Sequence, residues 1–133
     1  MIVRSEVVGI QSHDDILKTR QRARKLALEV GFSLVDQTRI VTAASEVARN
    51  TVVHGGGGTV TFTIVNEGSR RGLTLVFQDE GPGIADVERA LTDGFTTGTG
   101  LGLGLGGARR LMSDFHIEST PGKGTTVTVT RWR

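Results

Sequence analysis

Apolar residues recur along the chain with two different periods, which divide it into strands and helices. Val60, Phe62 and Ile64 alternate with polar residues, so they share one face of a strand. Ile40, Ala44 and Val47 return every three or four residues, which is the spacing of one helix face. The pattern predicts strands at Ile2–Ile10, 60–64, 73–77, 116–119 and 125–131, and helices at about 12–30, 34–54, 86–92 and 105–114.

Glycine-containing turns separate these elements. Gly31 ends the first helix, Gly55–Gly58 stop the second, and the turn at 68–72 joins two strands into a hairpin. The order β-α-α-β-β-α-β-β lacks the regular βαβ alternation of a Rossmann domain. It predicts an α+β, two-layer sandwich in which helices cover one face of a mixed, mostly antiparallel sheet. A length of 133 residues suits a single domain, 1–133.

Composition narrows the classes of function. The chain has no cysteine, which excludes disulfides and thiolate metal sites. It has no run of about 18 apolar residues and no secretion-signal pattern, so we expect a cytoplasmic protein without a membrane partner. The net charge is only +2, and Arg109-Arg110 and Arg131-Trp132-Arg133 are too scattered to indicate direct nucleic-acid binding.

The second helix carries a polar stripe beside its apolar face. Glu46, Asn50 and His54 follow one another at intervals of four residues, so they stack along the helix. Polar groups next to a buried face need partners. Two interpretations stay open from this segment alone: a functional site, or a solvated rim where Glu46 pairs with Arg49 or Arg39.

Asp79 continues the inward face of the strand that contains Leu73, Leu75 and Phe77. A carboxylate at the end of a buried row is costly unless a donor binds it. One interpretation is that Asp79 caps the following turn through its own backbone. The other is that it accepts a hydrogen bond from the amino group of adenine, because guanine presents an acceptor at that place. The hydroxyl of Thr125 is expected to point into the same pocket.

A glycine repeat precedes the third full helix. Glycines occupy every second position from Gly98 to Gly106, and packing alone does not require that pattern. Backbone without side chains at a helix N-terminus directs N–H groups at phosphate oxygens. The segment 102–107 also fits GxGxxG, but no strand leads into it and no acidic residue closes a βαβ unit, so a dinucleotide site is disfavoured.

The order and spacing of these segments resemble the GHKL ATP-binding superfamily. Glu46–Asn50 is similar to its N box, Asp79–Ile84 to its first glycine box and 98–106 to its second. Gly124-Thr125 matches the closing strand. Within the superfamily the chain is similar to the RsbT-type serine/threonine kinases and the anti-sigma-factor kinases of bacterial partner-switching modules.

The resemblance implies a Bergerat fold that binds ATP and Mg²⁺. It implies that Asn50 ligates the metal, Asp79 reads adenine, and Glu46 orients or deprotonates the attacking hydroxyl. The other nucleotide-binding positions that it implies are Gly81, Gly83, Thr96, Thr97, Gly98, Gly100, Leu101, Gly102, Leu103, Gly104 and Thr125.

Three functions are compatible with these motifs. The leading one is a kinase that phosphorylates Ser or Thr of a STAS-domain antagonist protein. The second is an anti-sigma factor that sequesters a sigma factor in a nucleotide-dependent way. The third is a histidine-kinase catalytic domain, which is disfavoured because His13, His54 and His116 lie on no spare helical hairpin. A sigma factor, a downstream phosphatase and a second copy of the chain are further candidate partners.

Overall fold

The computed structural model describes residues 2–91 and 104–133. The elements are β1 (Ile2–Ile10), α1 (His13–Val30), α2 (Leu34–Val53), β2 (Gly58–Glu67), β3 (Arg70–Asp79), α3 (Val87–Ala90), α4 (Gly104–Leu111), β4 (Asp114–Thr120) and β5 (Gly124–Trp132). The predicted order of elements and the α+β class are confirmed.

The strands form one sheet in the order β1-β2-β3-β5-β4. Each neighbouring pair among the described strands is antiparallel, whereas the sequence favoured a sheet with some parallel pairing. The connections explain this difference. Two helices bring the chain back before β2, so β2 runs against β1. The crossover through α3 and α4 leaves a place between β3 and β4, which β5 fills.

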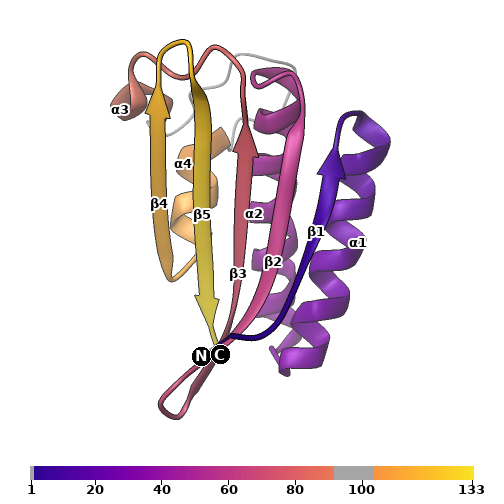
Figure 1. Cartoon of the computed structure of the whole chain (residues 1–133). Helices are drawn as coiled ribbons and strands as arrows, with labels where there is room; N and C mark the ends of the chain where they lie inside the picture. The colour runs from indigo at the N-terminus through magenta and orange to yellow at the C-terminus, as the bar shows by residue number, and fades with distance from the viewer. Residues whose placement is uncertain (1, 92–103) are drawn as a thin grey trace.

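Helices α1, α2 and α4 cover one face of the sheet, and the strands lie in front of them in Figure 1. The alternation read from the sequence gives the core: Val60, Phe62 and Phe77 are at most 1% exposed and face the helices. No helix within the described ranges is both long and apolar enough to cross a membrane.

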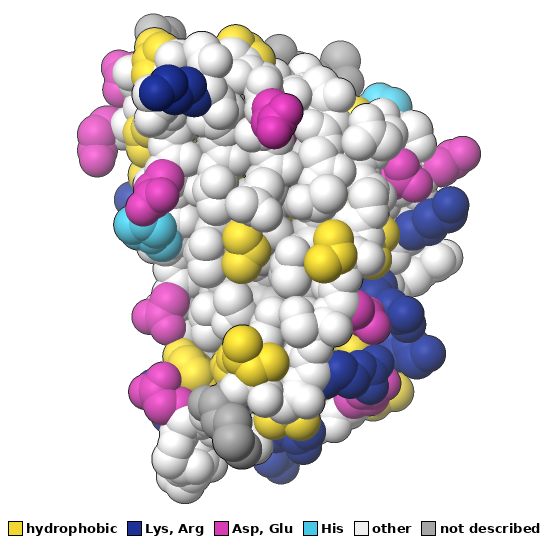
Figure 2. Space-filling model, in the orientation of Figure 1, with side chains coloured by type: hydrophobic (Ala, Val, Ile, Leu, Met, Phe, Trp, Pro, Cys, Tyr) yellow, Lys and Arg dark blue, Asp and Glu magenta, His cyan; other side chains and the backbone are white. Residues whose placement is uncertain are grey.

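None of the helices in residues 2–91 and 104–133 lies over the opposite face of the sheet, which is shown in Figure 2. It carries the other half of the strand alternation, with half-buried threonines such as Thr61, Thr74 and Thr128. Charged side chains lie mainly along the margins of this face (Figure 2). The sheet therefore has one apolar face that packs on helices and one face dominated by small polar groups.

Helix boundaries follow local backbone chemistry. Gly31 ends α1 with a φ of 96°, and its N–H donates to the carbonyls of Ala27 and Leu28. The hydroxyl of Ser33 caps α2 by accepting from the N–H of Asp36. Helix α4 was predicted to reach residue 114 but ends at Leu111. Strand pairing outcompetes the helix there, because the Ser113 N–H donates to the Thr130 carbonyl and β4 begins at the next residue.

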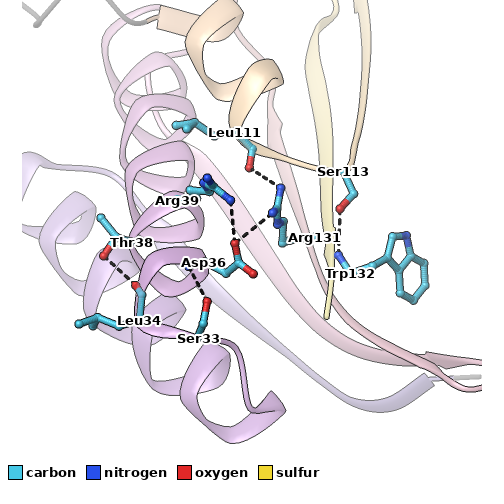
Figure 3. A network of polar contacts seen from close by, with 9 residues as sticks. All are labelled: Ser33, Leu34, Asp36, Thr38, Arg39, Leu111, Ser113, Arg131 and Trp132. Atoms are coloured by element: carbon cyan, nitrogen blue, oxygen red, sulfur yellow. Dashed lines mark hydrogen bonds and ion pairs between the residues drawn. The ribbon is translucent and has the colours of Figure 1, made fainter.

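A network of polar contacts ties the helices to the end of β5 (Figure 3). The Arg131 guanidinium donates to Asp36 Oδ1 at 3.0 Å and to the Leu111 carbonyl at 3.3 Å. Asp36 Oδ1 also accepts from Arg39 at 3.0 Å. This network joins the start of α2, the end of α4 and the last strand at the end of β3 remote from Asp79.

Candidate functional site

Three polar side chains form one row across neighbouring strands at an end of the sheet. Asp79 of β3 lies opposite Thr125 of β5, and Thr125 lies opposite Ser119 of β4. Residues paired in this way project from the same face. That face is the helix-covered one, because Phe77 and Val127, two residues before Asp79 and two after Thr125, are buried in the core. The predicted inward direction of Asp79 is confirmed.

The carboxylate of Asp79 contacts two backbone segments. Its Oδ1 accepts from the Gly81 N–H at 2.9 Å, which is the turn-capping contact considered from the sequence. On another side it packs against Gly55, where an added Cβ would lie 2.3 Å from Asp79 Cγ. Turn capping occupies one carboxylate oxygen, so it is compatible with a second role for the other oxygen.

Glycines bring several loops close together around Asp79. At Gly83, φ is +78° and an added Cβ would lie 2.4 Å from the Thr120 carbonyl oxygen. At Gly124, φ is +101° and an added Cβ would lie 2.1 Å from the Asp79 carbonyl oxygen. The Gly122 N–H also donates to the Pro82 carbonyl at 2.7 Å. The β4–β5 turn and the loop after β3 are therefore packed backbone to backbone, in a junction that only glycine fits. We call Gly55, Gly81, Gly83 and Gly124 the glycine junction.

A hydroxyl pair lies beside this junction. Ser119 Oγ is 2.8 Å from Thr125 Oγ1 and accepts from the Ile84 N–H at 2.6 Å. Thr125 is 5% exposed, as expected for an inward-facing hydroxyl. Sequence reasoning missed Ser119, although the β4–β5 hairpin pattern implied that a residue of β4 lies opposite Thr125.

Helix α2 supplies the other side of the site. Glu46 is only 8% exposed, and its Oε2 accepts from the N–H of Gly104, the first residue of α4, at 3.2 Å. The solvated-rim interpretation does not describe this geometry, because Glu46 is buried, Arg39 pairs with Asp36, and Arg49 Nη1 has no partner among the described residues. The third member of the predicted stripe, His54, is exposed and lies at the C-cap of α2.

Asn50 lies one helical turn beyond Glu46 and is half-buried. Its neighbour Arg49 was not among the predicted site residues, yet its Nη1 is buried without a hydrogen-bond partner in the described part of the chain. Buried polar atoms are normally paired, so this nitrogen is a donor of interest near the site.

Of the remaining predicted nucleotide-binding positions, some lie within the described residues and others lie outside them. Gly104 is described and contacts Glu46. Thr96, Thr97, Gly98, Gly100, Leu101, Gly102 and Leu103 lie outside the described residues, so their assignment stays a prediction. Within the described ranges there is no cluster of three or more His, Asp or Glu side chains that could bind a metal.

Residues 35–132 match the family model of the histidine kinase-, DNA gyrase B- and HSP90-like ATPases. The chain belongs to this ATPase family. Together with the fold, this confirms the resemblance inferred from the N box and the glycine boxes.

Two known proteins are similar to this chain over most of its length. The chain is 42% identical to the serine/threonine-protein kinase RsbT of Bacillus subtilis over 125 residues, 94% of either chain. It is 36% identical to the anti-sigma F factor of Thermoanaerobacter sp. over 99 residues, 70% of this chain and 68% of that protein.

Solved structures of low sequence identity share the fold. The RsbU and RsbW domains of a Mycobacterium tuberculosis protein match with a TM-score of 0.64 at 22% identity, covering 98% of this chain and 33% of that chain. The SiaB–SiaC complex from Pseudomonas aeruginosa gives a TM-score of 0.52 at 14% identity, with coverages of 99% and 91%. These likenesses bear on the fold alone.

Proposed function

We propose that this chain is an ATP-dependent protein serine/threonine kinase of a bacterial partner-switching module, with a STAS-domain antagonist protein as phosphoacceptor. The observation that carries the proposal is that Asp79 packs against Gly55 of the glycine junction, directly after α2, the helix that carries Glu46, in a member of an ATPase family. The 42% identity to a serine/threonine-protein kinase supports a protein hydroxyl as the acceptor.

The adenine base fits the end of the polar row. Asp79 offers a carboxylate oxygen to the exocyclic amino group, and Thr125 offers a hydroxyl from the next strand. Gly81 and Gly83 are proposed to permit close approach of the base, because glycine has no side chain to cover the backbone. Guanine places a carbonyl oxygen where adenine has its amino group, so the carboxylate repels it.

The phosphates and the metal fit the α2 side. Asn50 supplies an amide oxygen, a ligand type that suits Mg²⁺ when phosphate oxygens complete the shell. Positions 96–98 and 100–103 are proposed to surround the phosphates through N–H groups, next to Gly104, whose own N–H donates to Glu46. Bound Mg²⁺ neutralises charge on the transferring phosphoryl group.

Glu46 is proposed to orient the acceptor hydroxyl. The hydroxyl oxygen forms a bond to the γ-phosphorus, the bond from that phosphorus to the β–γ bridging oxygen breaks, and ADP leaves. The hydroxyl proton passes to the Glu46 carboxylate. Alignment matters more than base strength in this reaction, because phosphoryl transfer passes through a loose transition state. The contact with Gly104 supports this role, since it fixes one carboxylate oxygen of a nearly buried side chain.

The test is transfer of label from γ-labelled ATP to a purified STAS-domain protein in magnesium buffer. We expect label on one Ser or Thr of the acceptor, and none when that residue is replaced by Ala. Nucleotide binding without transfer to any STAS-domain acceptor tried would contradict the kinase proposal.

An anti-sigma factor is the second candidate, and exposed apolar residues favour it. Leu28, Leu34 and Val35 surround the turn between α1 and α2 and are 66%, 71% and 60% exposed. The 36% identity to an anti-sigma F factor supports the same reading. Co-purification with a sigma factor, lost in a Leu34→Ser variant that still binds nucleotide, would favour this function.

The proposed place of action is the cytoplasm, where ATP, Mg²⁺ and such protein partners occur together. A downstream phosphatase and a second copy of this chain are further proposed partners.

A further inference from the structure

The Ser119 hydroxyl makes three polar contacts but has only one hydrogen to donate. Its Oγ accepts from the Ile84 N–H at 2.6 Å and lies 2.8 Å from Thr125 Oγ1. The same oxygen lies 3.3 Å from the Gly124 carbonyl oxygen. A serine hydroxyl has one hydrogen and two lone pairs. Since the Ile84 N–H uses one lone pair, the hydrogen of Ser119 goes either to Thr125 or to Gly124.

The 2.8 Å contact is present in both arrangements, because either hydroxyl can be its donor, so they differ in where the hydrogen of Thr125 goes. If Ser119 donates to Gly124, the bond is long for an O–H···O contact, and Thr125 must spend its own hydrogen on Ser119. If Ser119 donates to Thr125 instead, the long contact with Gly124 is given up and the hydrogen of Thr125 is released. The second arrangement is favoured whenever an acceptor in the pocket can take the Thr125 hydrogen.

We infer that Ser119 is a positioning residue for base recognition, acting through Thr125. Hydrogen bonds then run in one direction, from the Ile84 N–H to Ser119, from Ser119 to Thr125, and from Thr125 to a ring nitrogen of the base. This inference rests on the proposed adenine site. Neither the sequence motifs nor the family assignment gave Ser119 a role.

This direction of hydrogen bonding makes Thr125 a donor beside the acceptor Asp79. Asp79 and Thr125 are directly opposite each other, so an acceptor and a donor lie side by side. Adenine offers the complementary pair, an amino donor next to the N1 acceptor. Guanine carries the opposite pair at these positions, so it mismatches at Asp79 and at Thr125. Ser119 thus links the loop that contains Gly83 to the choice of base.

The test is a double-mutant cycle on the dissociation constant for Mg·ADP, measured by calorimetry. We expect Ser119→Ala and Thr125→Val each to weaken binding about tenfold, the effect of one hydrogen bond. We expect the double variant to lie within about threefold of Thr125→Val alone, because Ser119 acts through Thr125. Ser119→Thr, which keeps a hydroxyl on the strand, should restore wild-type affinity.

Ser113→Ala is the matched control. The Ser113 hydroxyl also accepts a backbone N–H, that of Trp132 at 3.0 Å, but just before the far end of β4. The Ser113→Ala variant should bind Mg·ADP with unchanged affinity. The melting temperature of each variant reports whether that variant folds. In the transfer assay, Ser119→Ala should raise KM for ATP and leave kcat unchanged.

Three results would overturn the inference. They are additive effects of Ser119→Ala and Thr125→Val, wild-type affinity in Ser119→Ala, and a Ser119→Thr variant that folds but stays as weak as Ser119→Ala. If the wild-type chain binds no adenine nucleotide, the proposed function itself fails. Binding by the wild type with an additive cycle removes only the role of Ser119.

Discussion

Replacement of Asp79 by Asn changes the proposed base reader with almost no change in shape. Asp79 Oδ1 accepts from the Gly81 N–H at 2.9 Å, and only an oxygen can accept there. The amide oxygen of Asn must therefore take the Oδ1 position, which leaves the NH₂ group at the Oδ2 position. A rotation that exchanges the two atoms would set NH₂ against the Gly81 N–H. The variant thus presents a donor to the amino group of adenine.

The magnitude follows from two costs. A hydrogen bond to a charged group contributes about 1.5–3 kcal/mol, and an unpaired buried donor costs about 1–3 kcal/mol. The sum is roughly 2.5–6 kcal/mol, which corresponds to a loss of affinity of about 100-fold or more. Calorimetry with Mg·ADP measures this loss directly. Glu80→Gln is the matched control, because it removes the same charge from the next, exposed residue and should bind like the wild type.

The reasoning would be refuted by an Asp79→Asn variant that melts like the wild type and binds Mg·ADP within about tenfold of it. Such a result would mean that turn capping is the whole role of Asp79. Equal weakening by Glu80→Gln would instead indicate a general charge effect at this end of the sheet.

Other replacements test the remaining parts of the site and the fold. Glu46→Ala should bind Mg·ADP as the wild type does but transfer phosphate about 100-fold more slowly, and a wild-type rate in the labelling assay would remove Glu46 from the mechanism. Gly124→Ala and Gly122→Ala impose similar backbone strain, with φ of +101° and +81°, but only the Cβ at 124 meets a backbone oxygen. Urea unfolding should show Gly124→Ala less stable than Gly122→Ala by about 1–3 kcal/mol, and equal stabilities would contradict the packing argument. Asp36→Ala should lower stability by about 2 kcal/mol, because it breaks partly buried charged contacts. The exposed control Arg39→Ala should lower it by less than about 1 kcal/mol, and Mg·ADP affinity should be unchanged in both.

Local pattern was sufficient for most of the fold. The alternation of Val60, Phe62 and Ile64 predicted which strand face is buried, and the glycines after residue 54 predicted the end of α2 to within one residue. The predicted end of α4 was wrong, because the Ser113 N–H donates to the carbonyl of Thr130, a partner distant in sequence. The purely antiparallel pairing also depends on long-range order, since β5 enters between strands that precede it. That residues 1–133 form one domain stays a prediction.

The site was predictable where a single residue type carried the signal. Asp79 stood out because a carboxylate ended an apolar row, and its direction is confirmed. The partner of Glu46 was not predictable, since Gly104 is distant in sequence and the contact depends on how α4 packs on α2. Ser119 was missed because a half-buried serine in an edge strand gives no local signal. Its position opposite Thr125 depends on the register of β4 against β5.

The central place of β5 has a consequence for how the protein is made. This strand follows the other described strands in sequence, yet it joins β3 to β4 and completes the row between Asp79 and Ser119. A nascent chain on the ribosome therefore has no complete row of Asp79, Thr125 and Ser119 until β5 has emerged and paired with β3 and β4. Nucleotide present during synthesis would then stabilise only those molecules in which β5 has paired between β3 and β4.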